Sequence, residues 1–172
     1  MALSENFPKD PFVILDPSER WFPADESLRE TSAEKLLPPL VSEIRKKVDG
    51  FRKSGYEGAS ETSKSLLKWW FQREHFIEDI NSGETFNYYF AQREAIESLI
   101  YLHDVGKLEN QAQLTKYDAQ GLLSVQHFEE TWRRYVLKLA TGAGKTKVLS
   151  LALVWSYFHK LYEEDSDMAT NF

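Results

Sequence analysis

The sequence LATGAGKTKV, residues 139–148, joins two stretches that have the patterns of regular secondary structure. Residues 135–139 form a compact apolar run, which predicts a β-strand. Residues 145–162 form a long and mostly apolar segment, which predicts an α-helix. We therefore expect an α/β fold in which a strand, a glycine-rich turn and a helix follow one another.

A turn of this composition is suited to hold a chain of phosphates. Gly142 and Gly144 let the backbone bend without a Cβ in the way, and the partly positive start of the following helix points at the bound anion. Lys145 would reach the β- and γ-phosphates, and the Thr146 hydroxyl would ligate the Mg²⁺ that bridges them. The predicted binding set for ATP and Mg²⁺ in this loop is Thr141, Gly142, Ala143, Gly144, Lys145 and Thr146. The alternative is a strand-to-helix turn that binds no nucleotide.

The loop departs from the full phosphate-loop pattern at one position. That pattern has a glycine five residues before Gly144, where this chain has Leu139. The departure argues against kinase-like and GTPase-like proteins, and it suits the form found in helicase-type motors.

An aromatic segment upstream, FNYYFAQREAI at residues 86–96, leads into a helix that Gln92 opens. A glutamine amide donates and accepts hydrogen bonds at once, which matches the edge of adenine. Taken alone, Gln92 would be an exposed residue at the start of a helix. The phosphate loop downstream favours Gln92 as the residue that reads adenine.

The two segments together resemble the Q motif and motif I of superfamily 2 DEAD/DEAH-type helicases. More closely, QREAIE at residues 92–97 followed by residues 139–148 is similar to the restriction subunit of type III restriction enzymes and related helicases. The sharp part of the resemblance covers residues 86–160. It implies a helix-rich N-terminal region over residues 1–85, followed over residues 86–172 by the first elements of an incomplete RecA-like lobe.

The resemblance also implies a function for the whole motor, which is ATP-driven translocation on duplex DNA. The implied partners are ATP, duplex DNA bound through the remainder of the motor, and a modification (methyltransferase) subunit. The acidic motif II and the later motifs that complete catalysis are expected beyond Phe172. From this chain alone we expect ATP binding with negligible turnover, and no catalytic residue, because phosphoryl transfer needs charge neutralisation from several sides.

Three helices are expected before the loop. The first begins at Thr31 or Ser32 and runs through Phe51, with the basic residues between 45 and 53 on its solvent side. The second begins at Thr62 or Ser63 and ends near residues 81–83. The third keeps a helical period from residue 92 until Gly106.

A different class of enzyme is suggested by His103-Asp104, which resembles the core of HD-type metal phosphohydrolases. His75 would be a further ligand, and the acidic ligand would come from the weakly patterned segment that contains Asp118, Glu129 and Glu130. The alternative is that His103 and Asp104 merely finish a helix before Gly106.

His127 and His159 are expected to be structural or surface residues. The acidic run at residues 163–167 is expected to be a solvated loop. A third reading is a non-catalytic interaction module.

Composition sets further bounds. The 172-residue chain has no cysteine and a net charge of −6, so disulfides are excluded and a broadly basic nucleic-acid surface is not expected. The most apolar stretch, residues 148–158, is too short to cross a bilayer. With no signal sequence evident at the N-terminus, we expect a cytoplasmic location.

Overall fold

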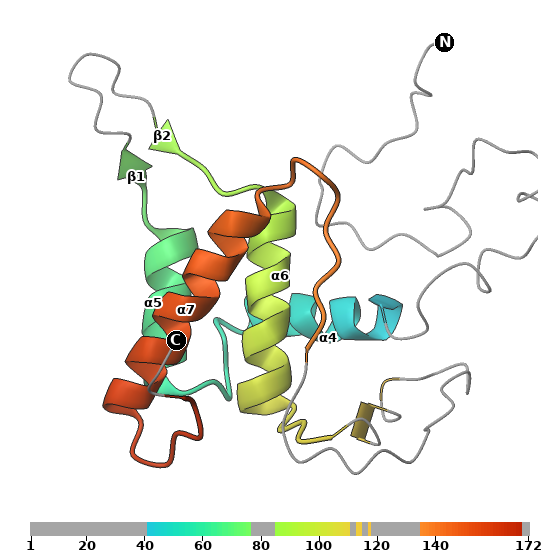
Figure 1. Cartoon of the computed structure of the whole chain (residues 1–172), viewed down its shortest axis with the longest axis vertical. Helices are drawn as coiled ribbons and strands as arrows, with labels where there is room; N and C mark the ends of the chain where they lie inside the picture. Colours follow the sequence, from blue (N-terminus) through green and yellow to red (C-terminus); the bar gives the residue numbers. More distant parts are fainter. Residues whose placement is uncertain (1–40, 77–84, 111–112, 115–116, 118–134, 170–172) are drawn as a thin grey trace, which may run out of the picture.

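A computed structural model of the protein describes residues 41–76, 85–110, 113–114, 117 and 135–169 (Figure 1). The expected start of the first helix and the residues Asp118, His127, Glu129 and Glu130 lie outside these ranges. The described elements are α4 (Val41–Lys53), α5 (Glu61–Gln72), β1 (His75–Phe76), β2 (Thr85–Phe86), α6 (Phe90–Ile100), the π-helix η1 (Tyr101–Val105) and α7 (Lys145–Tyr162).

The described fold is helix-rich, with one small antiparallel sheet. Helix α6 packs against α4, α5 and α7, and α7 also packs along α5 (Figure 1). The two strands pair His75 with Phe86 and Phe76 with Thr85, away from the helical core. The expectation of a mixed α/β protein is confirmed at this level.

The strand predicted over residues 135–139 is not formed. These residues have no regular secondary structure and no strand partner among the described parts of the chain. A strand needs a neighbour for its N–H and C=O groups, and the described chain provides none there. The second predicted helix is also shorter than expected, because the chain becomes extended at Arg73 and enters β1.

Local signals explain where the helices begin. The Ser60 hydroxyl accepts the N–H of Ser63 and caps α5, so the helix starts slightly before the predicted position. At the start of α6, Oε1 of Gln92 accepts the N–H of Tyr89 at 3.0 Å. The predicted end of the third helix is confirmed, because the helical backbone of α6 and η1 stops at Gly106.

Apolar residues from α4, α5, α6 and α7, and from the segment between α4 and α5, meet in the main core. Tyr56, Leu67, Ile96 and Ile100 are fully buried at its centre. The remaining buried members of this core are Phe51, Ala59, Trp70, Leu151 and Trp155. Residues from both predicted regions, 1–85 and 86–172, therefore contribute to this core.

Helix α7 buries only one of its apolar sides. Val148, Leu151 and Trp155 face the core. Large apolar side chains on the rest of its surface are exposed, namely Leu149, Leu153, Val154, Tyr157, Leu161 and Tyr162. No helix in the described parts of the chain is both long enough and apolar enough to span a membrane.

A buried carboxylate, Glu97, joins α4 to α6. Its two oxygens accept bonds from Nε and Nη2 of Arg52 at 2.8 and 2.6 Å, from Nε of Arg93 at 2.8 Å and from the Tyr56 hydroxyl at 2.8 Å. Arg45 of α4 pairs in the same way with Glu94. Two of the basic residues predicted to face solvent, Arg45 and Arg52, therefore face α6 instead.

We predict that Glu97→Ala lowers the free energy of unfolding by about 3–5 kcal/mol, because it leaves two guanidinium groups and a phenol without their shared acceptor. The control is Glu61→Ala, whose carboxylate is 86% exposed and is paired with Lys64 among the described residues. That change should cost no more than about 1 kcal/mol. Urea denaturation of both variants checks the prediction, and equal losses would contradict it.

Candidate functional site

The glycine-rich loop forms a turn that ends in the first residue of α7. Gly142 has φ of 82°, and Gly144 has φ of 77° and ψ of 42° as the N-cap of the helix. Both values are in the left-handed region, which costs a residue with a Cβ about 1–2 kcal/mol. The N–H of Ala143 donates to the carbonyl of Ala140 at 3.2 Å and closes the turn. The loop therefore has the bend that the two glycines predict.

Lys145 folds back over this turn. Its Nζ atom lies 3.1 Å from the carbonyl oxygen of Ala140, five residues earlier in the chain. The N–H groups of Lys145 and Thr146 belong to the first turn of α7, where a helix leaves its N–H groups without intrahelical acceptors. A fixed positive charge and helix-end N–H groups thus gather at one exposed place, with Thr141 and Thr146 also exposed.

Gln92 reaches the loop from α6. Its side chain is only 5% exposed, and a Cβ built on Gly144 would lie 2.0 Å from Nε2 of Gln92. The two predicted motifs are therefore in contact, although 52 positions separate Gln92 from Gly144 in the printed sequence. One lone pair of Oε1 is occupied by the Tyr89 N–H, so reading adenine would use the other lone pair and the Nε2 protons.

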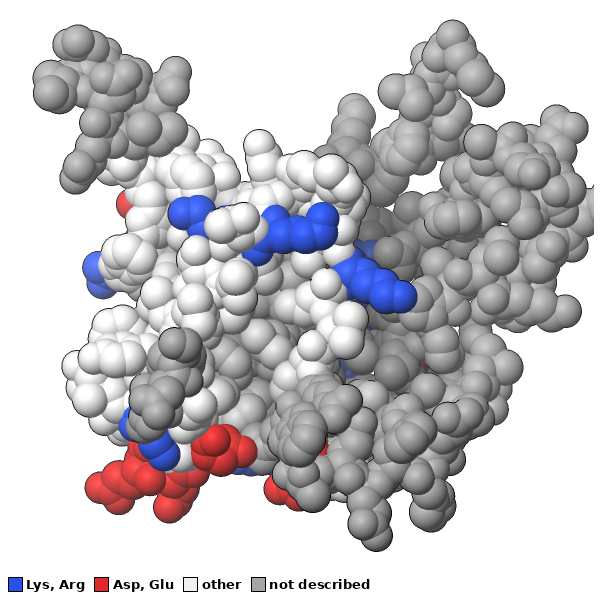
Figure 2. Space-filling view, in the orientation of Figure 1, with Lys and Arg blue, Asp and Glu red and all other residues white. Residues whose placement is uncertain are grey.

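Charge is distributed unevenly over the visible face. Figure 2 shows basic side chains on the part of the surface where α7 begins and acidic side chains where it ends. Exposed lysines of the loop segment are Lys138, Lys145 and Lys147, and Nζ of Lys147 lies 5.2 Å from the centre of the Phe86 ring. The basic end suits an anionic ligand.

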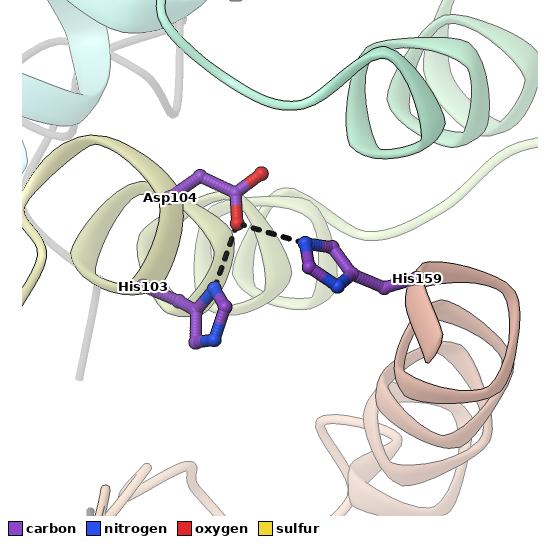
Figure 3. A group of neighbouring side chains, drawn as sticks. All are labelled: His103, Asp104 and His159. Atoms are coloured by element: carbon purple, nitrogen blue, oxygen red, sulfur yellow. Dashed lines mark hydrogen bonds and ion pairs between the residues drawn. The ribbon is translucent and has the colours of Figure 1, made fainter. Parts of the chain in front are cut away.

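A second group of chemically capable side chains lies at the other end of α7. His103 and Asp104 of η1 meet His159 from the last turn of α7, and all three are buried (Figure 3). Oδ1 of Asp104 lies 2.7 Å from Nδ1 of His103 and 3.6 Å from Nε2 of His159, while Oδ2 accepts the N–H of Ser60 at 3.0 Å. We call these three residues the His–Asp cluster.

The electrostatics of the His–Asp cluster favour an ionised carboxylate. Burial raises the pKa of Asp104, but hydrogen bonds led by that from His103, with the backbone N–H of Ser60 among them, outweigh burial and hold the pKa well below its usual range. The rings of His103 and Trp155 are nearly perpendicular, with centroids 5.2 Å apart. The carboxylate is therefore an acceptor at neutral pH, held between two imidazoles.

His159 is a buried residue and not a surface one. It lies beside Asp104, because α7 brings it to η1. The acidic run is a largely exposed loop, as expected, with Glu164, Asp165 and Asp167 exposed. It also makes contacts, since Glu163 accepts the N–H of Thr62 and Asp167 contacts His103.

The other residues named for a metal phosphohydrolase do not join the cluster in the described structure. His75 lies on β1, with Nε2 2.8 Å from the carbonyl oxygen of Trp69. Asp118, Glu129 and Glu130 lie outside the described residues. That alternative function stays a prediction.

Comparisons with known proteins give no further identification. No protein-family model matches the sequence, and neither a curated protein nor a solved structure shows significant similarity to it. The features that bear on function are therefore the loop, its contact with Gln92 and the motif resemblance.

The contact between Gln92 and Gly144 leads to a prediction about stability. A Cβ at residue 142 would have no atom within 4 Å. Gly142→Ala should therefore lower the free energy of unfolding by about 1–2 kcal/mol, because of the positive φ alone. Gly144→Ala should cost about 1 kcal/mol more, because Gln92 must move and lose its bond to Tyr89. Urea denaturation measures both.

A double-mutant cycle separates the two causes. Adding Gln92→Ala to Gly144→Ala removes the clash, so the combined loss should be smaller than the sum of the single losses. Adding Gln92→Ala to Gly142→Ala should give simple additivity. Additivity in both pairs would rule out the close approach.

Proposed function

We propose that the chain binds ATP with Mg²⁺ through the loop at the start of α7. The observation that carries this proposal is the two-glycine turn, whose left-handed residues bring the first N–H groups of α7 and the Lys145 ammonium to one place. Backbone N–H groups at a helix start, together with a lysine, form a binding site for phosphates. Exposure of the loop leaves it accessible to a ligand.

Each residue of the loop receives a role in this proposal. Gly142, Ala143 and Gly144 supply the backbone around the phosphates. Lys145 gives up its hydrogen bond to the Ala140 carbonyl and binds the β- and γ-phosphates instead. The phosphates carry full negative charges, so they attract the ammonium group more strongly than a neutral carbonyl does. The Thr146 hydroxyl ligates Mg²⁺, and Thr141 lies at the entrance to the loop.

Gln92 has two roles in this scheme. Its amide would bind the edge of adenine, as its position before the loop predicts. Its contact with Gly144 would also hold the loop against α6, so base recognition and phosphate binding would share one side chain. The neighbouring Tyr89 and Phe90 are exposed and provide apolar surface for a base.

We further propose that the chain is the nucleotide-binding front part of a DNA helicase or translocase, of the kind found in the restriction subunit of type III restriction enzymes. The resemblance of residues 86–160 supports this class. The exposed apolar side of α7 also supports it, because a helix that is apolar on both sides is usually covered on both sides within a larger lobe.

Binding without appreciable turnover is proposed for this chain alone. Residues 135–162 contain no aspartate or glutamate, so the loop segment supplies no carboxylate to hold Mg²⁺ or to orient an attacking water. ATP hydrolysis, and translocation on duplex DNA beside a modification subunit, belong to the complete motor in this proposal.

The test is a titration of the chain with a fluorescent ATP analogue and Mg²⁺. Lys145→Ala should weaken binding by about 10- to 100-fold, which corresponds to the loss of one charged hydrogen-bonding group. Lys138→Ala is the matched control, since it removes an equal charge from an exposed lysine of the same segment outside the loop. If both variants bind as tightly as the parent chain, the phosphate-binding loop is refuted.

A further inference from the structure

Three metal-ligating atoms converge in the His–Asp cluster. His103, Asp104 and His159 each offer one ligand atom to a set whose atoms all lie within 4.8 Å of one another. All three side chains are buried, and they come from two elements that are distant in the sequence (Figure 3). Two imidazoles and one carboxylate form a ligand set that zinc and related divalent ions accept.

The outer nitrogen of each imidazole is already engaged. Nε2 of His103 lies 3.0 Å from Oδ1 of Asp167, and Nδ1 of His159 lies 2.7 Å from the hydroxyl of Ser166. Metal-binding histidines almost always donate their second N–H to such a group, which fixes the tautomer and turns the lone pair inward. Both rings therefore have the outer contacts that a pair of ligands requires.

One ring nitrogen of each imidazole faces the same carboxylate oxygen. Oδ1 of Asp104 lies 2.7 Å from Nδ1 of His103 and 3.6 Å from Nε2 of His159. Because 3.6 Å is too long for a hydrogen bond, a proton between His103 and Asp104 joins those two groups only. A single metal ion can contact all three groups.

The distances are compatible with an ion after small movements of the side chains. Ligand atoms at about 2.0–2.1 Å from a tetrahedral ion are about 3.3 Å apart. The observed separations of 2.7 and 3.6 Å lie on either side of that value. The bond from Ser60 to Oδ2 leaves Oδ1 of Asp104 as the oxygen directed at the ion.

We propose that His103, Asp104 and His159 bind one divalent transition-metal ion of the zinc type. Three protein ligands leave a fourth position for water. The Asp104 carboxylate and the nearby Asp167 carboxylate together balance the charge of the ion. The side chain of Asp167, which contacts Nε2 of His103, is 51% exposed.

This centre is separate from the proposed site for ATP and Mg²⁺. His159 lies roughly 20 Å along α7 from Lys145, at about 1.5 Å per residue. Its nitrogen ligands suit zinc-type ions, whereas Mg²⁺ prefers oxygen ligands. The ion would fasten the end of α7 to η1, so the expected role is to stabilise the fold.

The test uses the full 172-residue chain after removal of metals with a chelator. Calorimetric titration with Zn²⁺ should give one bound ion per chain and a higher melting temperature, and Co²⁺ should give the visible absorption bands of a low-coordinate nitrogen and oxygen site. His159→Ala should abolish stoichiometric uptake, and His75→Ala is the matched control that should bind as the parent chain does. Far-ultraviolet circular dichroism verifies that each variant is folded.

Two further variants keep the proposal falsifiable. Asp167→Asn should weaken Zn²⁺ binding by about 10- to 100-fold, as expected for a group that orients a ligand. Lys145→Ala should leave Zn²⁺ binding unchanged. Zn²⁺ uptake therefore tests the metal site independently of whether the loop binds ATP. No uptake by the folded parent chain, or uptake that survives His159→Ala, would overturn the metal site and leave only a hydrogen-bonded cluster.

Discussion

Helices α6 and α7 can meet as they do only because residue 144 has no side chain. The buried amide of Gln92 occupies the place where a Cβ would stand, and the same glycine has the left-handed conformation that starts α7. One residue therefore fixes the direction of α7, the shape of the loop before it and the position of Gln92. The His–Asp cluster depends on this arrangement as well, because the direction of α7 determines where His159 lies.

A buried network of charged groups holds another side of α6. Glu97 is fully buried and is surrounded by donors from Arg52, Arg93 and Tyr56. Such a network is costly to assemble, but it tolerates few alternative packings, because any shift leaves a buried charge without its partners. It holds α4 and the segment after it against the helix that carries Gln92.

Helix positions were the most predictable part of the fold. Apolar spacing and glycine positions gave α6 with η1 and α7 closely, and they gave the existence of α5 although not its end. The prediction of a strand at residues 135–139 is wrong. An apolar run indicates a preference for extended backbone, but it does not indicate whether a neighbouring strand is present. The sequence predicted the fold class only coarsely, as a mixed α/β protein with mostly helices.

The candidate sites divide in the same way. Gly142, Gly144 and Lys145 are adjacent in the sequence, so the loop could be identified from local spacing. His159 could not be assigned to His103 and Asp104, because helical periodicity tells which side of a helix a residue occupies and not what faces that side. The direction of Arg45 and Arg52 cannot be predicted for the same reason, since the glutamates that they contact on α6 lie more than 40 positions away.

The direction of α7 has an electrostatic consequence. A helix carries a macrodipole with about half a positive charge at its N-terminus and half a negative charge at its C-terminus. In this chain the first pole adjoins the loop suited to an anion, and the second adjoins the cluster suited to a cation. The one dipole of α7 therefore favours an anion at its start and a cation at its end. A cation at the start or an anion at the end would be repelled by the partial charge there.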